Sequence, residues 1–103
     1  MARPDDGNQD LLAALSHPLR RRILRLLPDE DERAMSPGDI ARELDEELTH
    51  ISYHVRVLAD CGAAKLVRTE KVRGATRHFY RQTIEAGWAR EVLAESEPED
   101  ESP

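Results

Sequence analysis

The residues best suited to recognising another molecule gather in one short stretch, positions 48–62, which runs Leu-Thr-His-Ile-Ser-Tyr-His-Val-Arg-Val-Leu-Ala-Asp-Cys-Gly. Ile51, Val55 and Leu58 recur at the spacing of one helix face, which must be buried. The side chains that fall largely off this face are polar, aromatic or cationic, namely His50, Ser52, Tyr53 and Arg56. Arginine can pair with guanine, and histidine or tyrosine can meet base edges or phosphates. The stretch is therefore predicted to be a helix whose N-terminal half fits a DNA major groove, with an ordinary solvated face as the alternative.

Three further candidates flank this face. Thr49 lies at the predicted helix N-terminus, where backbone N–H groups favour a phosphate, although it can equally be only a cap. Arg73 and Arg77 lie near a predicted hairpin turn, where they can grip the minor groove or the DNA backbone. For each arginine taken singly, the alternative that a hairpin tip simply needs polar residues is almost as good.

Charge is distributed unevenly along the chain. Taken alone, the net charge of −6 at pH 7 argues against a nucleic-acid partner. Residues 16–28, however, hold four arginines and no acid, and residues 49–82 hold seven bases and two acids. Phosphate meets the local field of one face and not the total charge. On this pattern alone, DNA binding and merely solvated faces explain the blocks equally well.

Other chemistries are poorly represented. There is no glycine-rich phosphate loop, no nucleophile–base pair with recognisable spacing and no acid pair suited to a cleft, so an enzyme is not expected. The four histidines and the single Cys61 lack zinc-ligand spacing, so no metal or other cofactor is expected. Cys61 is either a redox switch or, more commonly, a small buried side chain. Without a transmembrane-length apolar run, a signal peptide or a disulfide partner, the expected location is the cytoplasm, with no membrane contact.

A second short helix is predicted just before the recognition stretch. Ser36-Pro37-Gly38-Asp39 combines a cap, a proline in the first helical position and the acid of a capping box. The acids at 45–47 end this helix, and the next is predicted to start near a Thr49 cap. Two short helices joined so tightly form a helix-turn-helix.

A β-hairpin is predicted to follow. Gly62 suits the position after a helix C-terminus. Strands are expected over 65–69 and 76–81, with the turn at Arg73-Gly74. Because a two-stranded hairpin is not stable alone, it must pack on the helices, and Phe79 is the predicted anchor.

Two helices are predicted ahead of the helix-turn-helix and one behind the hairpin. The first follows a cap at Asp10. The second has Ser16 or His17 as its cap and Pro18 in its first turn, and it ends at Pro28. Its arginines, Arg20, Arg21, Arg22 and Arg25, are placed on its outer side, shielding the surface in preference to contacting phosphate. The last helix is predicted to begin at Thr83.

The outermost helices carry apolar stripes that have no obvious place in so small a core. These are Leu11, Leu12 and Leu15 in the first helix and Ile84, Trp88 and Val92 in the last. A large exposed apolar patch marks a partner surface, so the stripes are predicted to pack across a two-fold axis in a homodimer. Residues 1–9 and the acidic tail 95–103 are expected to be disordered, which leaves one domain over 10–94.

Several motifs resemble those of ArsR-like winged helix-turn-helix regulators. His17-Pro18-Leu19-Arg20 resembles the opening of that family, Ile51-Ser52-Tyr53-His54-Val55 its recognition helix, and Arg73-Gly74 with Tyr80 its wing. The resemblance covers roughly residues 10–93 and implies a homodimeric transcriptional regulator with one recognition helix per subunit in adjacent major grooves. Many members bind metal through a Cys-x-Cys pair before the recognition helix, but the segment 39–44 has no cysteine and the last helix no histidine.

The sequence thus predicts a mainly α protein with a small β-hairpin (α+β), folded as a winged helix-turn-helix. The predicted function is that of a sequence-specific, dimeric regulator of double-stranded DNA, a repressor without a metal-sensing site and with an unknown effector. The alternative is a winged-helix module that binds protein and not DNA.

Overall fold

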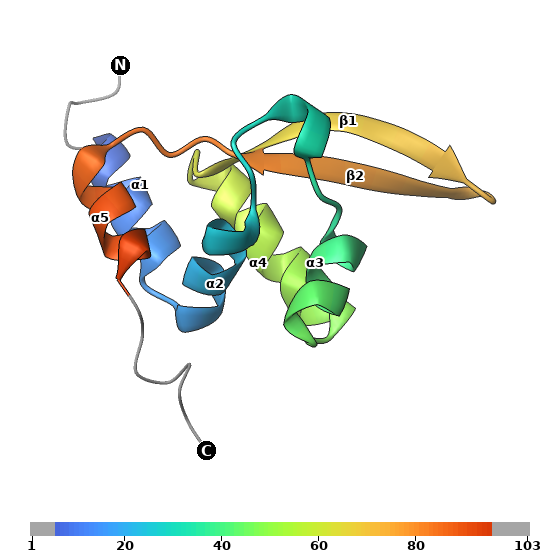
Figure 1. Ribbon diagram of the computed structural model, residues 1–103, viewed down its shortest axis with the longest axis horizontal. Helices are drawn as coiled ribbons and strands as arrows, with labels where there is room; N and C mark the ends of the chain where they lie inside the picture. Colours follow the sequence, from blue (N-terminus) through green and yellow to red (C-terminus); the bar gives the residue numbers. More distant parts are fainter. Residues whose placement is uncertain (1–5, 96–103) are drawn as a thin grey trace.

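The computed structural model describes residues 6–95, with side chains from residue 10 onward. The elements in chain order are α1 (Asp6–Leu15), α2 (Pro18–Leu26), the short 3-10 helix η1 (Asp31–Arg33), α3 (Pro37–Leu44), α4 (Leu48–Asp60), β1 (Ala64–Val72), β2 (Ala75–Gln82) and α5 (Gly87–Ala94). The predicted fold class is confirmed: five helices accompany one two-stranded antiparallel hairpin. Helices α1 and α5 lie at one end of the molecule, and the hairpin reaches outward from the other (Figure 1).

The core is built around α4, as its apolar periodicity predicted. Ile51, Val55 and Leu58 are almost completely buried, and they meet Ile23 and Ile40 from α2 and α3 in one cluster. None of the described helices combines the length and apolar character needed to cross a membrane.

Hydrogen bonds fix the start of α3 and the start of α4. Ser36 Oγ accepts from the Asp39 amide at 3.2 Å, and Asp39 Oδ2 accepts from the Ser36 amide at 3.1 Å, which completes the predicted capping box. Asp45 ends α3 in the left-handed conformation with φ of 56°. The Glu47 carbonyl then accepts from Ile51, so Glu47 is the N-cap of α4 and Thr49 lies inside its first turn. The expected cap at Thr49 is therefore corrected by two residues.

The hairpin is longer than predicted but turns where expected. Arg73 and Gly74 both have positive φ, 53° and 84°, which is the backbone that a two-residue hairpin turn with the correct twist requires. Phe79 is buried, with the Arg68 guanidinium 4.4 Å from its ring centre, but it is not part of the main core cluster. The β2 residue that packs against that cluster is Tyr80, so the prediction of Phe79 as the anchor is not confirmed. Met35 and Tyr80 exchange two backbone hydrogen bonds, so the segment before α3 also pairs with β2, which the sequence did not indicate.

The arginines of α2 do not face outward, contrary to the prediction. All four are half-buried, and each donates to carbonyl groups near the end of a neighbouring helix. Arg20 donates to Ala13 and Ala14 and Arg21 to Leu15 in α1; Arg22 donates to Leu44 in α3; Arg25 donates to Leu93 in α5 and to Glu95 just beyond it. The last carbonyls of a helix lack partners within it, so guanidinium groups satisfy them and complement the negative end of the helix dipole.

Two predicted helix starts are corrected. Helix α1 begins at Asp6, so Asp10 is an internal residue and not a cap, and the helix extends into the segment 1–9 that was expected to be disordered. Helix α5 begins at Gly87, because the Thr83 amide and hydroxyl are bound to the Ala63 and Gly62 carbonyls at 3.0 and 2.8 Å. The remaining residues that were expected to be disordered, 1–5 and 96–103, lie outside the described part of the chain.

Replacing the capping acid should loosen the helix-turn-helix. Burial opposes the charge of Asp39, but hydrogen bonds from Ser36 and the charges of Arg77 and Arg42 outweigh it and hold the pKa of Asp39 below its ordinary value. Asp39→Ala should therefore lower the free energy of unfolding by about 1–2 kcal/mol in urea denaturation at neutral pH. Glu43→Ala, an acid removed from an exposed position of the same helix, should change it little. Equal effects of the two substitutions would contradict this assignment.

Candidate nucleic-acid interface

The N-terminal half of α4 presents a polar face to solvent. Thr49, His50, Tyr53 and Arg56 are exposed, while Ser52 is half-buried at the edge of this face. Thr49, Tyr53 and Arg56 follow one another at helical spacing and so form one outward stripe. The structure therefore brings the predicted base-contacting residues together on one side of α4.

The other side of this half-helix is held by a cluster of cationic and aromatic groups around one buried histidine. His54 is buried, and its Nδ1 lies 3.2 Å from Arg20 Nη1. Its ring is 4.4 Å from that of His17, which also caps α2 by accepting from the Leu19 amide at 3.0 Å. The sequence placed His54 beside the buried stripe, but nothing in it indicated the link to Arg20. This cluster fixes the recognition helix against the start of α2.

A groove separates α4 from the hairpin. It consists of two adjoining hollows of about 310 and 190 Å³ that share Pro37, Ser52 and His78. The larger extends toward Arg42, and the smaller extends toward Arg56. Ser52 and Arg56 thus border the hairpin as well as the outward face of α4.

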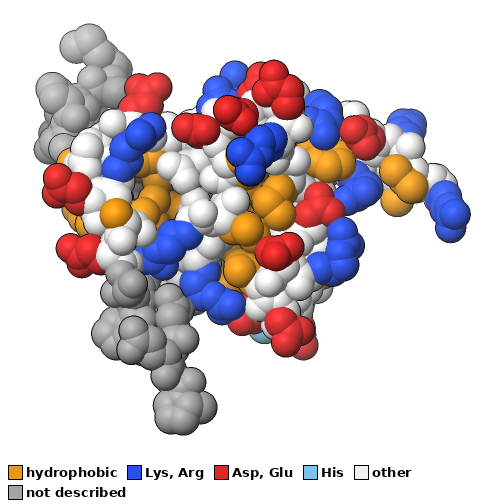
Figure 2. Space-filling model, viewed as in Figure 1, with side chains coloured by type: hydrophobic (Ala, Val, Ile, Leu, Met, Phe, Trp, Pro, Cys, Tyr) orange, Lys and Arg blue, Asp and Glu red, His pale blue; other side chains and the backbone are white. Residues whose placement is uncertain are grey.

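The two arginines predicted for the wing are placed differently. Arg73 is exposed in the turn at the free end of the hairpin, where basic side chains are visible in Figure 2. Arg77 instead donates to Ser36 Oγ at 3.0 Å and to Asp39 Oδ1 at 2.8 Å, and its guanidinium lies 5.1 Å from the centre of the Phe79 ring. Arg77 therefore ties the wing to the start of α3.

The residues predicted to pair two protomers separate into two groups. Leu15 and Ile84 are buried in the core of the protomer itself, which removes them from any exposed surface. Leu11 is partly buried against the same core. Leu12, Trp88 and Val92 remain exposed at the end of the molecule formed by α1 and α5.

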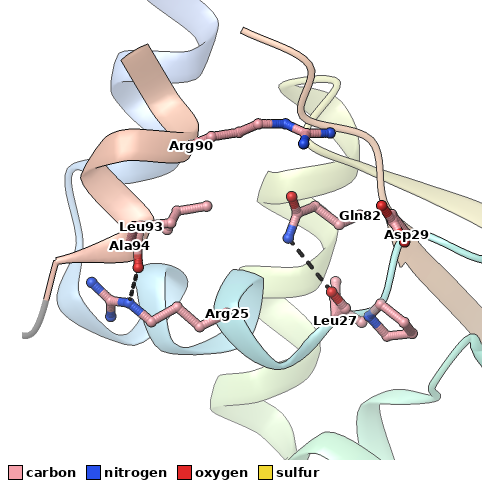
Figure 3. Close-up of a pocket in the computed structure, with 8 residues that line it drawn as sticks. Arg25, Leu27, Asp29, Gln82, Arg90, Leu93 and Ala94 are labelled. Atoms are coloured by element: carbon pink, nitrogen blue, oxygen red, sulfur yellow. Dashed lines mark hydrogen bonds between the residues drawn. The ribbon is translucent and has the colours of Figure 1, made fainter. Parts of the chain in front are cut away.

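Another hollow, of about 520 Å³, lies away from α4, between the end of α2, the end of β2 and α5 (Figure 3). Arg25 Nε donates to the Leu93 carbonyl at 2.7 Å, and Gln82 Nε2 donates to the Leu24 carbonyl at 2.6 Å. These polar groups therefore hold the walls of the hollow together.

The described residues do not meet the requirements of a metal site or of a reactive thiol. Among the side chains that the structure describes, those of residues 10–95, no three from His, Cys, Asp or Glu come together in a way that could hold a metal ion. Cys61 is half-buried at the end of α4, where burial and the nearby Asp10 and Asp60 raise the pKa of its thiol. It is thus a poor thiolate and contacts the core as a small apolar group.

A family model described as a helix-turn-helix domain matches residues 15–67, which span α2, α3, α4 and the start of β1. The chain belongs to this helix-turn-helix family. The match covers slightly more than half of the sequence and includes the whole outward face of α4. No curated protein matches the sequence.

Solved structures show the same fold over most of the chain. HlyU from Vibrio cholerae is 20% identical, with a TM-score of 0.62 and coverage of 91% of each chain. A predicted DNA-binding transcriptional regulator from E. coli is 23% identical, with a TM-score of 0.59 and coverage of 84% of this chain and 82% of that one. An ArsR family transcriptional regulator, RHA00566, is 21% identical, with a TM-score of 0.56 and coverage of 91% and 86%. The family match and this shared fold confirm the resemblance to ArsR-like winged helix-turn-helix proteins.

Acid should destabilise the protein through His54. Burial and the positive charges of His17, Arg20 and His50 lower the pKa of His54 below its ordinary value of about 6.5. The unfolded chain therefore takes up this proton first, and stability should fall as the pH drops below about 6.5 toward the folded pKa.

The pH dependence of the free energy of unfolding checks this for His54. In the His54→Gln variant, the loss of stability on acidification that His54 causes should disappear. The His50→Gln variant, which removes a histidine from the exposed face of α4, should still show that loss. A His54→Gln profile parallel to that of the wild type between pH 7 and 5 would refute the assignment.

Proposed function

We propose that the protein is a sequence-specific regulator that binds double-stranded DNA by placing α4 in the major groove. The observation that carries this proposal is the exposed stripe of Thr49, Tyr53 and Arg56, with His50 beside it, on the second helix of a helix-turn-helix. In such motifs the N-terminal residues of the second helix contact base edges. Here those positions carry hydroxyl, aromatic and guanidinium groups, which suit base edges and phosphates.

The wing supports the same orientation. Arg73 is exposed at the free end of a hairpin that projects away from the helices, so it can reach DNA beside the groove that α4 occupies. Arg77 is occupied by Ser36 and Asp39, and its role is to set the position of the wing. In this arrangement Arg73 contacts the DNA backbone or the minor groove, and the side chains of α4 distinguish one base pair from another.

The regulator acts as a homodimer that pairs through the end opposite the wing. Leu12, Trp88 and Val92 expose apolar surface on α1 and α5, and a two-fold axis there would leave both copies of α4 available to DNA. Two recognition helices in successive major grooves are about 34 Å apart, so the preferred site is an inverted repeat.

We infer further that this regulator represses transcription by occupying a promoter, and that it acts without a resident metal. The competing proposal is a winged-helix module that binds protein through its apolar helices and acidic segments. Exposed cationic groups on both α4 and the wing tip favour DNA, since a protein-binding module has no need of them at these two places.

Arg56→Ala should weaken binding to the preferred duplex by about 1–3 kcal/mol and relax discrimination at one base position, because it removes a base contact. Arg73→Ala should weaken binding to preferred and random duplexes alike, because it removes a contact without sequence information. Fluorescence anisotropy with both duplexes measures the two effects. Equal losses on specific and random DNA in both variants would contradict the division of roles.

The apolar end should hold two protomers together. The wild type should sediment as a dimer at micromolar concentration, and the double variant Leu12→Glu with Val92→Glu should sediment as a monomer. Leu66→Glu on β1 is the matched control, because Leu66 is 43% exposed and Val92 38%, yet Leu66 lies on the hairpin. A monomeric wild type, or dissociation caused equally by Leu66→Glu, would rule out this interface.

A further inference from the structure

The groove between α4 and β2 has walls from two separate elements of the proposed DNA-binding surface. Thr76, His78 and Tyr80 alternate along β2 and share one face of the strand. Ser52 and Arg56, one helical turn apart, form the opposite wall on α4. The groove thus runs between the element proposed for the major groove and the element proposed for the minor groove.

The charge of this groove is positive. Arg42 and Arg77 lie at its wider end, and both donate to the same oxygen of Asp39, at 2.6 and 2.8 Å. One carboxylate between two guanidinium groups leaves one positive charge in excess, and Arg56 adds another at the narrower end. No aspartate or glutamate is among the residues that line the groove itself.

The positive run has a defined limit. Beyond Leu48 lies an adjoining hollow that is lined by Asp45 and Glu46. Arg42 lines both this hollow and the groove. These acids would repel a phosphate, so the surface suited to an anionic chain ends at Arg42.

In the proposed orientation α4 lies in a major groove and the wing reaches the neighbouring minor groove. These two grooves are divided by one sugar-phosphate strand, so that strand is the part of the duplex that lies between α4 and the wing. We propose that this groove seats that strand. Arg42 and Arg77 supply the charge, and Ser52 and His78 supply hydrogen-bonding groups. Asp39 is a positioning residue that holds the two guanidinium groups side by side. This inference rests on the proposed function and adds Arg42 and His78 to the DNA contacts.

The salt dependence of binding tests the role of Arg42. Each phosphate contact contributes about 0.9 to the slope of log K against log salt concentration. Arg42→Gln should therefore reduce that slope by about 0.9 for each protomer bound, on random and preferred duplexes alike. Arg42 is 73% exposed, and an unchanged unfolding curve verifies that the fold is kept. Lys65→Gln on β1 is the control, because Lys65 is also an exposed cation but lines neither part of the groove.

His78→Ala supplies a second, independent readout. It should lower affinity for every duplex without changing which sequence is preferred. An unchanged slope in Arg42→Gln, an equal change in Lys65→Gln, or unchanged affinity in His78→Ala would each overturn the proposed seat while wild-type binding persists. A wild type that binds no duplex at low salt would instead overturn the proposed function itself.

Discussion

The arrangement of the helices depends on the arginines of α2. A helix leaves its last carbonyl groups without internal partners, and α2 lies where α1, α3 and α5 all end nearby. Its guanidinium groups reach all three ends, and Arg22 also pairs with Glu46 in the turn before α4 at 3.1 Å. Arg20 reaches His54 on α4 as well. One cationic helix therefore sets the positions of the end formed by α1 and α5, of the turn between α3 and α4, and of α4 itself.

This arrangement changes the interpretation of the charge blocks. The arginine-rich segment 16–28 is occupied within the protomer, so it contributes little to any surface field. The DNA-compatible charge is that of α4, the groove and the wing tip. In the view of Figure 2, acidic and basic side chains are interspersed over the helices, and basic side chains stand at the free end of the hairpin. The local field of one face, and not the net charge, is what a duplex would meet.

Much of the fold could be predicted because its signals are local. Apolar spacing fixed the buried face of α4, the Ser36 capping box marked the start of α3, and Arg73-Gly74 marked the hairpin turn. The features that could not be predicted depend on contacts between residues that are far apart in the sequence. Arg77 turned toward Asp39 and not toward solvent, and Ile84 entered the core because Thr83 is tied to Gly62 and Ala63. The groove between α4 and β2 could not be predicted either. The alternation along β2 shows which face of the strand carries His78, but it does not show which helix lies opposite that face.

Selection of bound sequences from a pool of random duplexes, at low salt and with the 103-residue chain, shows whether two copies of α4 read adjacent major grooves. If they do, the selection should enrich a two-fold symmetric sequence whose half-sites are centred about 10 base pairs apart. Recovery of random sequences, or of a single asymmetric half-site that does not depend on spacing, would show that they do not.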